Sequence, residues 1–455
     1  MKQIPRILAL ITICALITGT LAACKKSNDT AVEPRSSGSK QVINLWSFTD
    51  EVPNMLDKYR ELHPDFDQQY EVKTTIIATT DGAYQPALDA ALAGGGGGAP
   101  DIYTAEAAFV LKYTQGDASQ YAAPYASLGI DVARLVKEAN IAQYTIDIGT
   151  RGGSDLVALG FQATGGAFIY RRSIAKDVWG TDDPAVIKDK VGPGWEKFFA
   201  AAVDLRAKGY GIVSGDGDIW HAVENSSDKG WIVDGKLYID PKREAFLDLS
   251  KQLKDNDYHN DTQDWQDAWF ADMKDAGAKQ VFGFFGPAWL INYTIAGNSG
   301  GSKPGEGTFG DWAVCEPPVG FFWGGTWILG NKDSKVKDIV GDIIEWITLD
   351  YSETGLQYFW ANGTLNGPGG TKDTVGSGTV MSNSNGTLEF LGGQNMFDVF
   401  VPAGQFANGK NLTQYDESIN NYWRGQVREY TAGNKSREQA LADFRQQVTD
   451  NLDIR

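Results

Sequence analysis

Short apolar runs alternate with amphipathic segments of helical length from residue 41 onward. Three runs have the length and the β-branched content of strands: 41–47, 70–79 and 100–106. The segments that follow them place an apolar residue every three or four positions, as helices do: 51–63, 83–93 and 107–115. This alternation predicts an α/β fold whose sheet is mainly parallel and is covered by helices on both faces.

Aromatic rings and carboxylates follow two of the predicted strands. In an open parallel sheet, a ligand lies beyond the carboxyl ends of the strands. The candidate ligand contacts at these ends are Trp46, Phe48, Asp50, Glu51 and Glu106. Each carboxylate also has a structural interpretation, because an acid at a helix N-terminus caps the helix or interacts with its dipole.

The run 281–330 interleaves large aromatic residues with glycine and proline. Turn residues predict that several of these rings lie on loops at strand ends, where ligand contacts concentrate. We take three tryptophans of this run as candidate ligand contacts: Trp289, Trp323 and Trp327. An indole offers a flat apolar face and one N–H donor, which suits a sugar ring that has an apolar face and several hydroxyls. The alternative is that most of these rings pack between elements of the core.

Three further candidates come from their local surroundings. The polar stretch 214–270 contains several aromatic side chains, and Trp220 is the candidate ligand contact among them. Gln394 and Asn395 follow a pair of glycines, and a tight loop of this kind offers both donors and acceptors. A purely structural turn is an equally good interpretation of this loop.

Composition excludes several classes of function. The chain has 58 Asp and Glu residues against 41 Lys and Arg residues, and its formal net charge of −17 argues against nucleic-acid binding by the folded part. The stretch 214–218 (SGDGD) lacks the later glycine and glutamate of a calcium-binding loop. We therefore predict no metal and no cofactor. The length of 455 residues favours two or more lobes over a single core.

The N-terminus has the pattern of a bacterial lipoprotein signal peptide. A basic start and an apolar core at 7–17 are followed by Leu-Ala-Ala-Cys at 21–24, which resembles a lipobox. This resemblance implies that residues 1–23 are removed and that Cys24 is lipidated; a plain secretory signal is the alternative. Residues 24–39 then form a flexible tether without apolar periodicity. Cys315 is left as a free thiol, and we expect it to be a small buried side chain.

Three segments resemble a known family in their sequence and order. These are GPAWL (286–290), GDWAVCEPP (310–318) and a stretch that begins GGTWILGNKDS (324–347). They resemble the extracellular solute-binding proteins of ABC importers, family 1, which includes maltose-binding protein. The resemblance implies the type II fold of periplasmic binding proteins, with two α/β lobes joined by a multi-strand hinge and the ligand cleft between the lobes.

The resemblance also implies where the lobes begin and end. The N-terminal lobe comprises 40–159 plus 327–375, and the C-terminal lobe comprises 160–326 plus 376–455. The first crossing between them then lies near residues 160–166, and Gln162 faces the cleft or the hinge as a further candidate ligand contact.

As a member of this family, the protein would be an exported lipoprotein on the outer face of the bacterial cytoplasmic membrane, at the cell surface or in the periplasm. It would act as a monomer without enzymatic activity, close on a carbohydrate and deliver it to the permease subunits of an ABC importer. The many rings favour an oligosaccharide. The alternatives are a receptor of the same fold for a polyamine, an iron chelate or a peptide, and a surface glycosidase, which would need two carboxylates flanking the scissile bond.

Overall fold

The computed structural model describes residues 39–79, 82–365 and 370–454. The chain divides into two units, and the structure below is that of the second, Lys40–Arg455. The predicted signal peptide, Cys24 and the predicted tether up to residue 38 lie outside the described residues. Among the described helices, none is long and apolar enough to cross a membrane.

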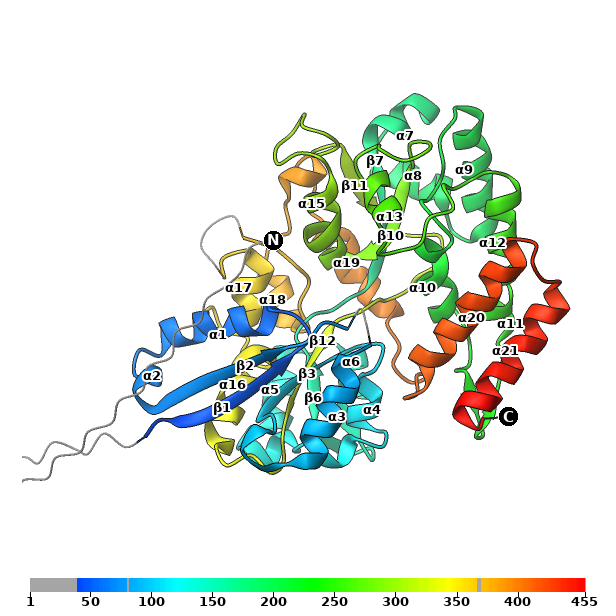
Figure 1. Ribbon diagram of the computed structural model, residues 1–455. Helices are drawn as coiled ribbons and strands as arrows, with labels where there is room; N and C mark the ends of the chain where they lie inside the picture. Colours follow the sequence, from blue (N-terminus) through cyan, green and yellow to red (C-terminus); the bar gives the residue numbers. More distant parts are fainter. Residues whose placement is uncertain (1–38, 80–81, 366–369, 455) are drawn as a thin grey trace, which may run out of the picture. The chain divides into compact units, whose positions relative to one another are not determined.

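The first sheet has five strands: β1 (Gln41–Ser47), β2 (Tyr70–Ile76), β3 (Ile102–Glu106), β6 (Ala158–Gly160) and β12 (Thr326–Gly330). Their spatial order is β2-β1-β3-β12-β6 (Figure 1). β2 and β3 run parallel to β1, which confirms the predicted parallel pairing. β12 is antiparallel to β3 and β6, because it reaches the sheet from the second sheet and not through a crossover helix.

Helices cover both faces of this sheet, as predicted. They are α1 (Glu51–Leu62), α2 (Phe66–Gln69), α3 (Tyr84–Gly94), α4 (Val110–Thr114), α5 (Val132–Ala139), α6 (Gln143–Gly149), α16 (Lys337–Thr348) and α17 (Leu356–Asn362). α1, α5 and α16 bury apolar side chains against one face, while α3, α4 and α6 do so against the other. In α1 the buried positions 52, 55, 56 and 59 have the spacing of one helix face. We call the five-stranded sheet with these helices the first lobe.

The second sheet is antiparallel and has three strands: β7 (Gly166–Arg171), β10 (Gly283–Pro287) and β11 (Trp312–Cys315). β7 lies in the centre, with Phe285 of β10 and Cys315 of β11 both opposite Phe168. Both faces are buried, because Phe168 and Phe285 pack into one core cluster while Ile169 and Val314 pack into another. Cys315 is a buried free thiol, which confirms the prediction for this residue.

The remaining elements surround the second sheet or connect it to the first. The helices of the core cluster that contains Phe168 are α7 (Arg172–Trp179), α8 (Pro184–Val191), α9 (Trp195–Ala207), α10 (Gly217–Asn225), α12 (Phe246–Asp255), α20 (Asp416–Thr431) and α21 (Arg437–Leu452). The short helix α11 (Pro241–Glu244) contacts α10 and α12. Shorter helices are α13 (Asp267–Asp272), α14 (Ala288–Leu290), α15 (Ala296–Asn298), α18 (Gly378–Ser382) and α19 (Phe397–Ala403). Two small hairpins are β4 (Thr150–Arg151) with β5 (Asp155–Leu156), and β8 (Ile232–Val233) with β9 (Lys236–Leu237). We call the three-stranded sheet with the helices of its core the second lobe.

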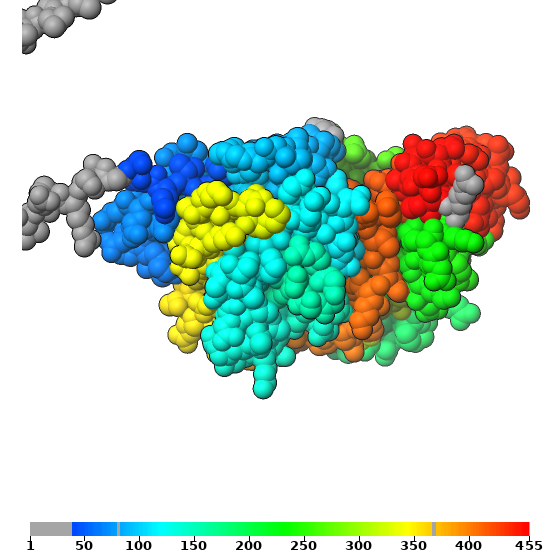
Figure 2. Space-filling model, turned by 90° about the horizontal axis from the view of Figure 1, so that it is seen from below, coloured from blue at the N-terminus to red at the C-terminus, as the bar shows by residue number. Residues whose placement is uncertain are grey.

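The chain passes between the two sheets through extended segments. It leaves β6 and enters β7 across residues 161–165, and it returns from β11 to β12 across residues 316–325. Single β-bridges join these segments to each other and to a third one, at Gly165–Phe322 and Gln162–Val375. On the face shown in Figure 2, the orange segment around residue 400 lies between the cyan helices of the first lobe and the green and red parts of the second. The lobe boundaries given above stay predictions.

Candidate ligand-binding site

Two of the predicted tryptophans come together where the return segment passes α14. The Nε1–H of Trp289 donates a hydrogen bond to the backbone oxygen of Trp323 over 3.1 Å. Their ring centroids lie 4.9 Å apart at an interplanar angle of 66°. Trp265 lies nearly parallel to Trp289, with 6.2 Å between the ring centroids, and edge-on to Trp323. We call Trp265, Trp289 and Trp323 the tryptophan cluster; Tyr293, which is 68% exposed, lies at its edge.

Trp265 was not among the predicted contacts, and its conformation is unusual. Its backbone φ is +65°, a value that residues other than glycine rarely adopt, and its side chain remains 40% exposed. The preceding Asp264 is held by an ion pair with Arg424 of α20. A Cβ on Gly217 would lie 2.5 Å from a carboxylate oxygen of Asp264, so a larger residue there would require the Asp264 side chain to shift. Such strain persists where the surrounding structure enforces it, and it often marks a functional position.

The sequence did contain a signal for Trp265. Trp265 and Trp269 are four residues apart in a polar segment, so one helix face would have to bury both rings. The structure buries Trp269, whose Nε1–H donates to Asp218 over 2.9 Å, and leaves Trp265 exposed before α13 begins.

Trp323 also lines a pocket of about 80 Å³, which we call the acidic pocket. Its lining comes from the first lobe, from α10, from α20 and the residues just before it, and from the return segment: Ala107, Ala108, Leu111, His221, Glu224, Asn225, Phe322, Trp323, Gly324, Leu412, Thr413, Asp416 and Asn420. The imidazole ring of His221 is stacked on Trp323, with 4.6 Å between the ring centroids. The pocket and the tryptophan cluster therefore share one side chain and form a continuous site.

Carboxyl groups dominate the polar chemistry of this pocket. Glu224 accepts a hydrogen bond from Asn420 over 2.6 Å, and its other oxygen lies 3.2 Å from Nδ1 of His221. Burial opposes ionisation of Glu224, but these contacts and the charge of Arg243 hold its pKa below the ordinary value. Asp416, by contrast, has a pKa raised to about 7, chiefly by burial.

Glu106, a predicted contact, lies at the end of β3 beside this pocket. One of its oxygens accepts a hydrogen bond from the backbone N–H of Ala108 over 2.9 Å. Burial, with the nearby charges of Glu417 and Glu224, raises the pKa of Glu106 to about 7. Glu106 is thus in the same neighbourhood as Trp323, and its role as a ligand contact stays a prediction.

A second polar group forms around Asp373, at the third crossing segment. Gln162 donates to Asp373 over 2.9 Å, and Trp360 donates to the same oxygen over 3.3 Å. Burial, together with the charges of Asp373 and Asp50, raises the pKa of Glu51 to about 8. The predicted contacts Gln162, Asp50 and Glu51 therefore gather in one place. Asp50 makes no side-chain capping bond to α1.

The other predicted side chains near β1 pack partly into the first lobe. Trp46 and Phe48 are half-buried, and Phe48 lies edge-on to the rings of Tyr84 and Phe109. Each keeps some exposed surface at the strand end.

Four predicted contacts are buried in the core or hydrogen-bonded to the backbone in this structure. Their placement does not support the expectation that they meet a ligand. Trp220 is buried against Phe246, and Trp327 is fully buried with its N–H donated to the backbone of Thr145. The amide of Gln394 makes two hydrogen bonds to the backbone of Val314, at 2.8 and 2.9 Å. The amide oxygen of Asn395 accepts from the backbone N–H groups of Gly386 and Phe397. The side-chain amides of Gln394 and Asn395 therefore stabilise the backbone around this loop, which agrees with the interpretation of the loop as a structural turn.

Within the described ranges, no group of three or more His, Cys, Asp or Glu side chains could hold a metal ion.

The raised pKa values of several buried and half-buried carboxyl groups predict that the stability of the protein falls as pH rises. Five have a pKa raised to between about 6 and about 8: Glu51, Glu106, Asp218, Asp373 and Asp416. The native state then holds protons that the unfolded chain releases between about pH 4 and pH 8, so the free energy of unfolding decreases across this window. We expect urea denaturation to show lower stability at pH 8.5 than at pH 5.5.

Glu51 provides the matched test of this prediction. Glu51→Gln removes the charge that burial disfavours, so it should raise the free energy of unfolding at pH 8.5 by about 1 to 2 kcal/mol and flatten the pH dependence. Glu61→Gln, on the exposed end of α1, should leave the pH dependence unchanged. An equal slope in Glu51→Gln and the parent protein would contradict the prediction.

Comparison with known proteins connects this geometry to a family. Residues 46–350 match the family model described as bacterial extracellular solute-binding protein. A search of the curated proteins found no match. Among solved structures, one described as extracellular solute-binding protein family 1 is similar with a TM-score of 0.70 and 16% identity, covering 90% of this chain and 100% of that one.

Two further solved structures are named as sugar-binding proteins. The galacto-N-biose/lacto-N-biose I-binding protein of an ABC transporter from Bifidobacterium longum, in complex with lacto-N-biose, has a TM-score of 0.63 and 16% identity, over 91% of this chain and 98% of that one. The sugar-binding protein MalE from Xanthomonas citri has a TM-score of 0.65 and 14% identity, over 90% of this chain and 97% of that one. At these identities the likeness shows the fold: the mixed α/β architecture of periplasmic binding proteins.

Proposed function

Because this chain belongs to the family of bacterial extracellular solute-binding proteins, we propose that it captures a carbohydrate between its lobes and delivers it to an ABC importer. The family consists of transport binding proteins, and in this proposal the protein binds its ligand without altering it. The known sugar complexes of its structural relatives support a sugar as the solute.

The observation that carries the proposal is the tryptophan cluster beside a pocket of hydrogen-bonding groups. Trp265 and Tyr293 keep large exposed surfaces, and Trp289 and Trp323 are half-buried. An exposed indole face next to polar side chains suits a ring that is apolar on one face and carries hydroxyls at its edge. We infer that sugar rings stack on the cluster while His221, Asn225 and the nearby carboxylates bond to the hydroxyls.

An oligosaccharide fits the distribution of polar groups better than a single sugar does. The group around Asp373, with Glu51, Asp50 and Gln162, is separate from the acidic pocket. In our proposal, a longer ligand contacts the accessible members of this second group, Asp50 and Glu51, with Trp46 and Phe48 beside them, while Gln162 and Asp373 are themselves buried.

Ligand entry would require the lobes to move apart. Pockets that enclose a small ligand usually measure about 300 to 1,000 Å³, whereas the acidic pocket is about 80 Å³. Hinge closure around a ligand is an established mode of switching, and the extended segments at 161–165 and 316–325 are where we place the hinge. The side chain of Gln85 in α3 donates to Glu417 in α20 over 2.7 Å, a contact between the lobes that opening would break.

The proposed cellular arrangement follows from the N-terminal sequence. Cleavage before Cys24 and its lipidation would anchor the protein to the outer face of the cytoplasmic membrane, with residues 25–39 as a tether. The protein would act as a monomer and present the outer surfaces of both lobes to the permease subunits.

A thermal-shift screen tests this proposal. A ligand that binds only the native state raises the unfolding midpoint by mass action. We expect one class of glycan to raise it, and peptides and polyamines to leave it unchanged. A rise of the unfolding midpoint with polyamines alone would overturn the carbohydrate assignment. Consumption of the sugar during incubation would show that the protein is an enzyme.

A further inference from the structure

We propose that the acidic pocket receives a protonated amino group of the ligand, so that an amine-bearing glycan binds more tightly than the same sugar with a hydroxyl in place of the amine. This inference rests on the proposed function and names the ligand class of that site. The chemistry that carries it is the arrangement of charged groups around the pocket.

Four carboxyl groups belong to the pocket or adjoin it. Glu224 and Asp416 are part of the lining. Glu106 directly precedes Ala107 and Ala108 of the lining, and Glu417 directly follows Asp416. Glu106 is close enough to Glu417 and Glu224 for their charges to raise its pKa.

Three side chains that are cationic or can become so face these carboxyls: His221, Arg243 and Arg424. Arg424 interacts with Glu224 through its charge, but it forms an ion pair with Asp264. His221 lies beside Glu224, as described above. Arg243 interacts with Glu224 and Asp416 through its charge, but its guanidinium is committed elsewhere: it donates to the backbone oxygen of Lys229 over 2.9 Å and lies 4.6 Å from the ring centroid of Trp231. Carboxyl groups therefore outnumber cations around the pocket.

Asp416 supplies an independent indication of a missing positive partner. It is only 4% exposed. Its Oδ1 accepts from the backbone N–H and the hydroxyl of Thr413, at 3.0 and 2.6 Å. Its Oδ2 is buried and has no hydrogen-bond partner among the residues that the structure describes. A buried acceptor without a donor is unfavourable, and an ammonium group brings three donors and a compensating charge.

The pocket has room for a substituent of the sugar. Its volume of about 80 Å³ can take an amino group and the carbon that bears it. Trp323 lines the pocket and belongs to the tryptophan cluster, so a sugar ring placed on the cluster can direct a substituent inward. Hydrogen bonds between an ammonium group and carboxylates are stronger than those of a neutral hydroxyl.

The raised pKa values of Glu106 and Asp416 predict that protons are released when an amine binds. Near pH 7, Glu106 and Asp416 are partly protonated, since the pKa of each is raised to about 7. An ammonium group stabilises their ionised forms, so its binding should release protons to the buffer. A neutral sugar should not.

Isothermal titration at pH 7 tests the inference with matched pairs of sugars. The pairs are glucosamine and glucose, galactosamine and galactose, and the β-1,4-linked glucosamine and glucose oligomers, with spermidine as a free polyamine. We expect at least one amino sugar to bind about 10- to 100-fold more tightly than its hydroxyl counterpart. Its apparent binding enthalpy should change between buffers of different ionisation enthalpy, because protons are released.

The outcomes separate this inference from the proposed function. If no amino sugar binds more tightly than its counterpart, the inference fails, and the proposed function still stands if neutral sugars bind. If spermidine binds and no sugar does, both the inference and the carbohydrate assignment fail.

Asp416→Asn is the variant that tests the pocket directly, since it keeps the size of the side chain and removes its charge. The quantity to compare is the dissociation constant of the neutral sugar divided by that of its amino counterpart. In Asp416→Asn we expect this ratio to fall to within about threefold of one. Glu417→Gln should lower the ratio in the same direction if Asp416→Asn proves unstable. Glu429→Gln, on α20 but outside the pocket, is the matched control and should preserve both dissociation constants. An unchanged ratio in both pocket variants would overturn the inference.

Discussion

Replacing Trp289 by alanine is expected to weaken carbohydrate binding by roughly 30- to 1,000-fold, which corresponds to about 2 to 4 kcal/mol. Trp289 packs against the rings of both Trp265 and Trp323. Its loss removes one stacking surface and also the hydrogen bond that fixes the backbone at Trp323. The dissociation constant, measured by isothermal titration with the best glycan from the thermal-shift screen, checks this prediction.

Two further variants make this result specific. Trp179→Ala removes a half-buried tryptophan that also makes one hydrogen bond, to Asp204, but lies on α7 outside the tryptophan cluster. It should leave the dissociation constant within about threefold of the parent value. Trp289→Phe keeps an aromatic face and loses the N–H donor, so it should fall between the parent protein and Trp289→Ala. Equal affinities in Trp289→Ala and Trp179→Ala would contradict the proposed site.

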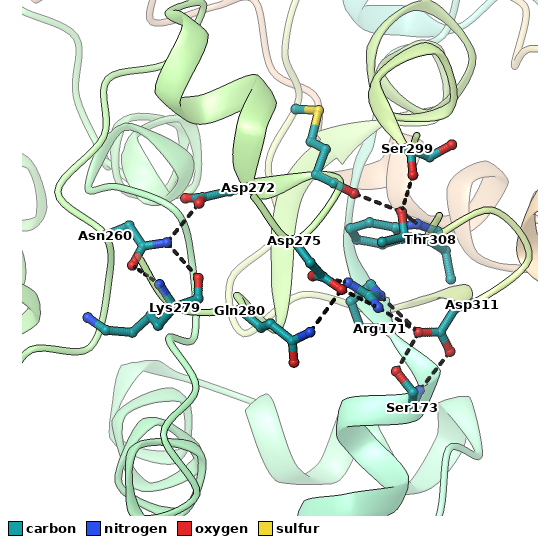
Figure 3. Close-up of polar contacts among 12 residues, drawn as sticks. Arg171, Ser173, Asn260, Asp272, Asp275, Lys279, Gln280, Ser299, Thr308 and Asp311 are labelled. Carbon is teal, nitrogen blue, oxygen red and sulfur yellow. Dashed lines mark hydrogen bonds and ion pairs between the residues drawn. The ribbon is translucent and has the colours of Figure 1, made fainter. Parts of the chain in front are cut away.

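The second large effect is expected at Arg171, where an ion-pair network holds two loops of the second lobe to β7. The side chain of Arg171 is only 6% exposed. It donates to Asp275 over 2.5 and 3.1 Å and to Asp311 over 2.9 Å (Figure 3). Asp311 also accepts from the backbone N–H of Ser173 over 2.8 Å, and Asp275 from the side chain of Gln280 over 3.0 Å. One guanidinium therefore joins the loop after α13 to the segment before β11.

Arg171→Met should lower the free energy of unfolding by roughly 2 to 4 kcal/mol, because it leaves two partly buried carboxylates without their cation. The guanidinium also lies 5.3 Å from the ring centroid of Trp312, a contact that is lost at the same time. Urea denaturation at pH 7 measures the change.

Two controls test whether the effect of Arg171→Met comes from the burial of the ion pairs and from the unpaired carboxylates. Arg206→Met breaks an ion pair with Asp257 whose side chains are 46% and 55% exposed, so it should cost no more than about 1 kcal/mol. Adding Asp275→Asn and Asp311→Asn to Arg171→Met should recover part of the lost stability, since the unpaired charges are then gone. A loss of the same size in Arg206→Met would mean that burial does not govern these pairs.

The sequence predicted the first lobe well because its signals are local. The three N-terminal strands, their helices and their parallel pairing follow from apolar spacing over stretches of about ten residues. The position of the first crossing near residues 160–166 came from the resemblance to the family, and it stays a prediction with the lobe boundaries. The fold thus follows from patterns that each lie within one element.

The sequence could not decide which aromatic rings face solvent. On β12, Trp327 and Leu329 point into one core and Ile328 into the other, so the register with β3 buries the indole. Nothing near Trp327 in the sequence distinguishes it from Trp323, which lies only four residues earlier on the return segment. Trp220 is buried for a similar reason, on a helix whose inner face meets Phe246.

By itself, then, the sequence determined the α/β class, the order of the elements in the first lobe and the presence of aromatic and acidic residues suited to a sugar. Only the tertiary structure decided which of these residues gather. Trp265 meets Trp289, and Glu106 meets Glu224 and Glu417, although they lie on segments far apart in the chain. Residue spacing specifies the face of an element, but a site built from several elements depends on how those elements pack, which is a property of the whole chain.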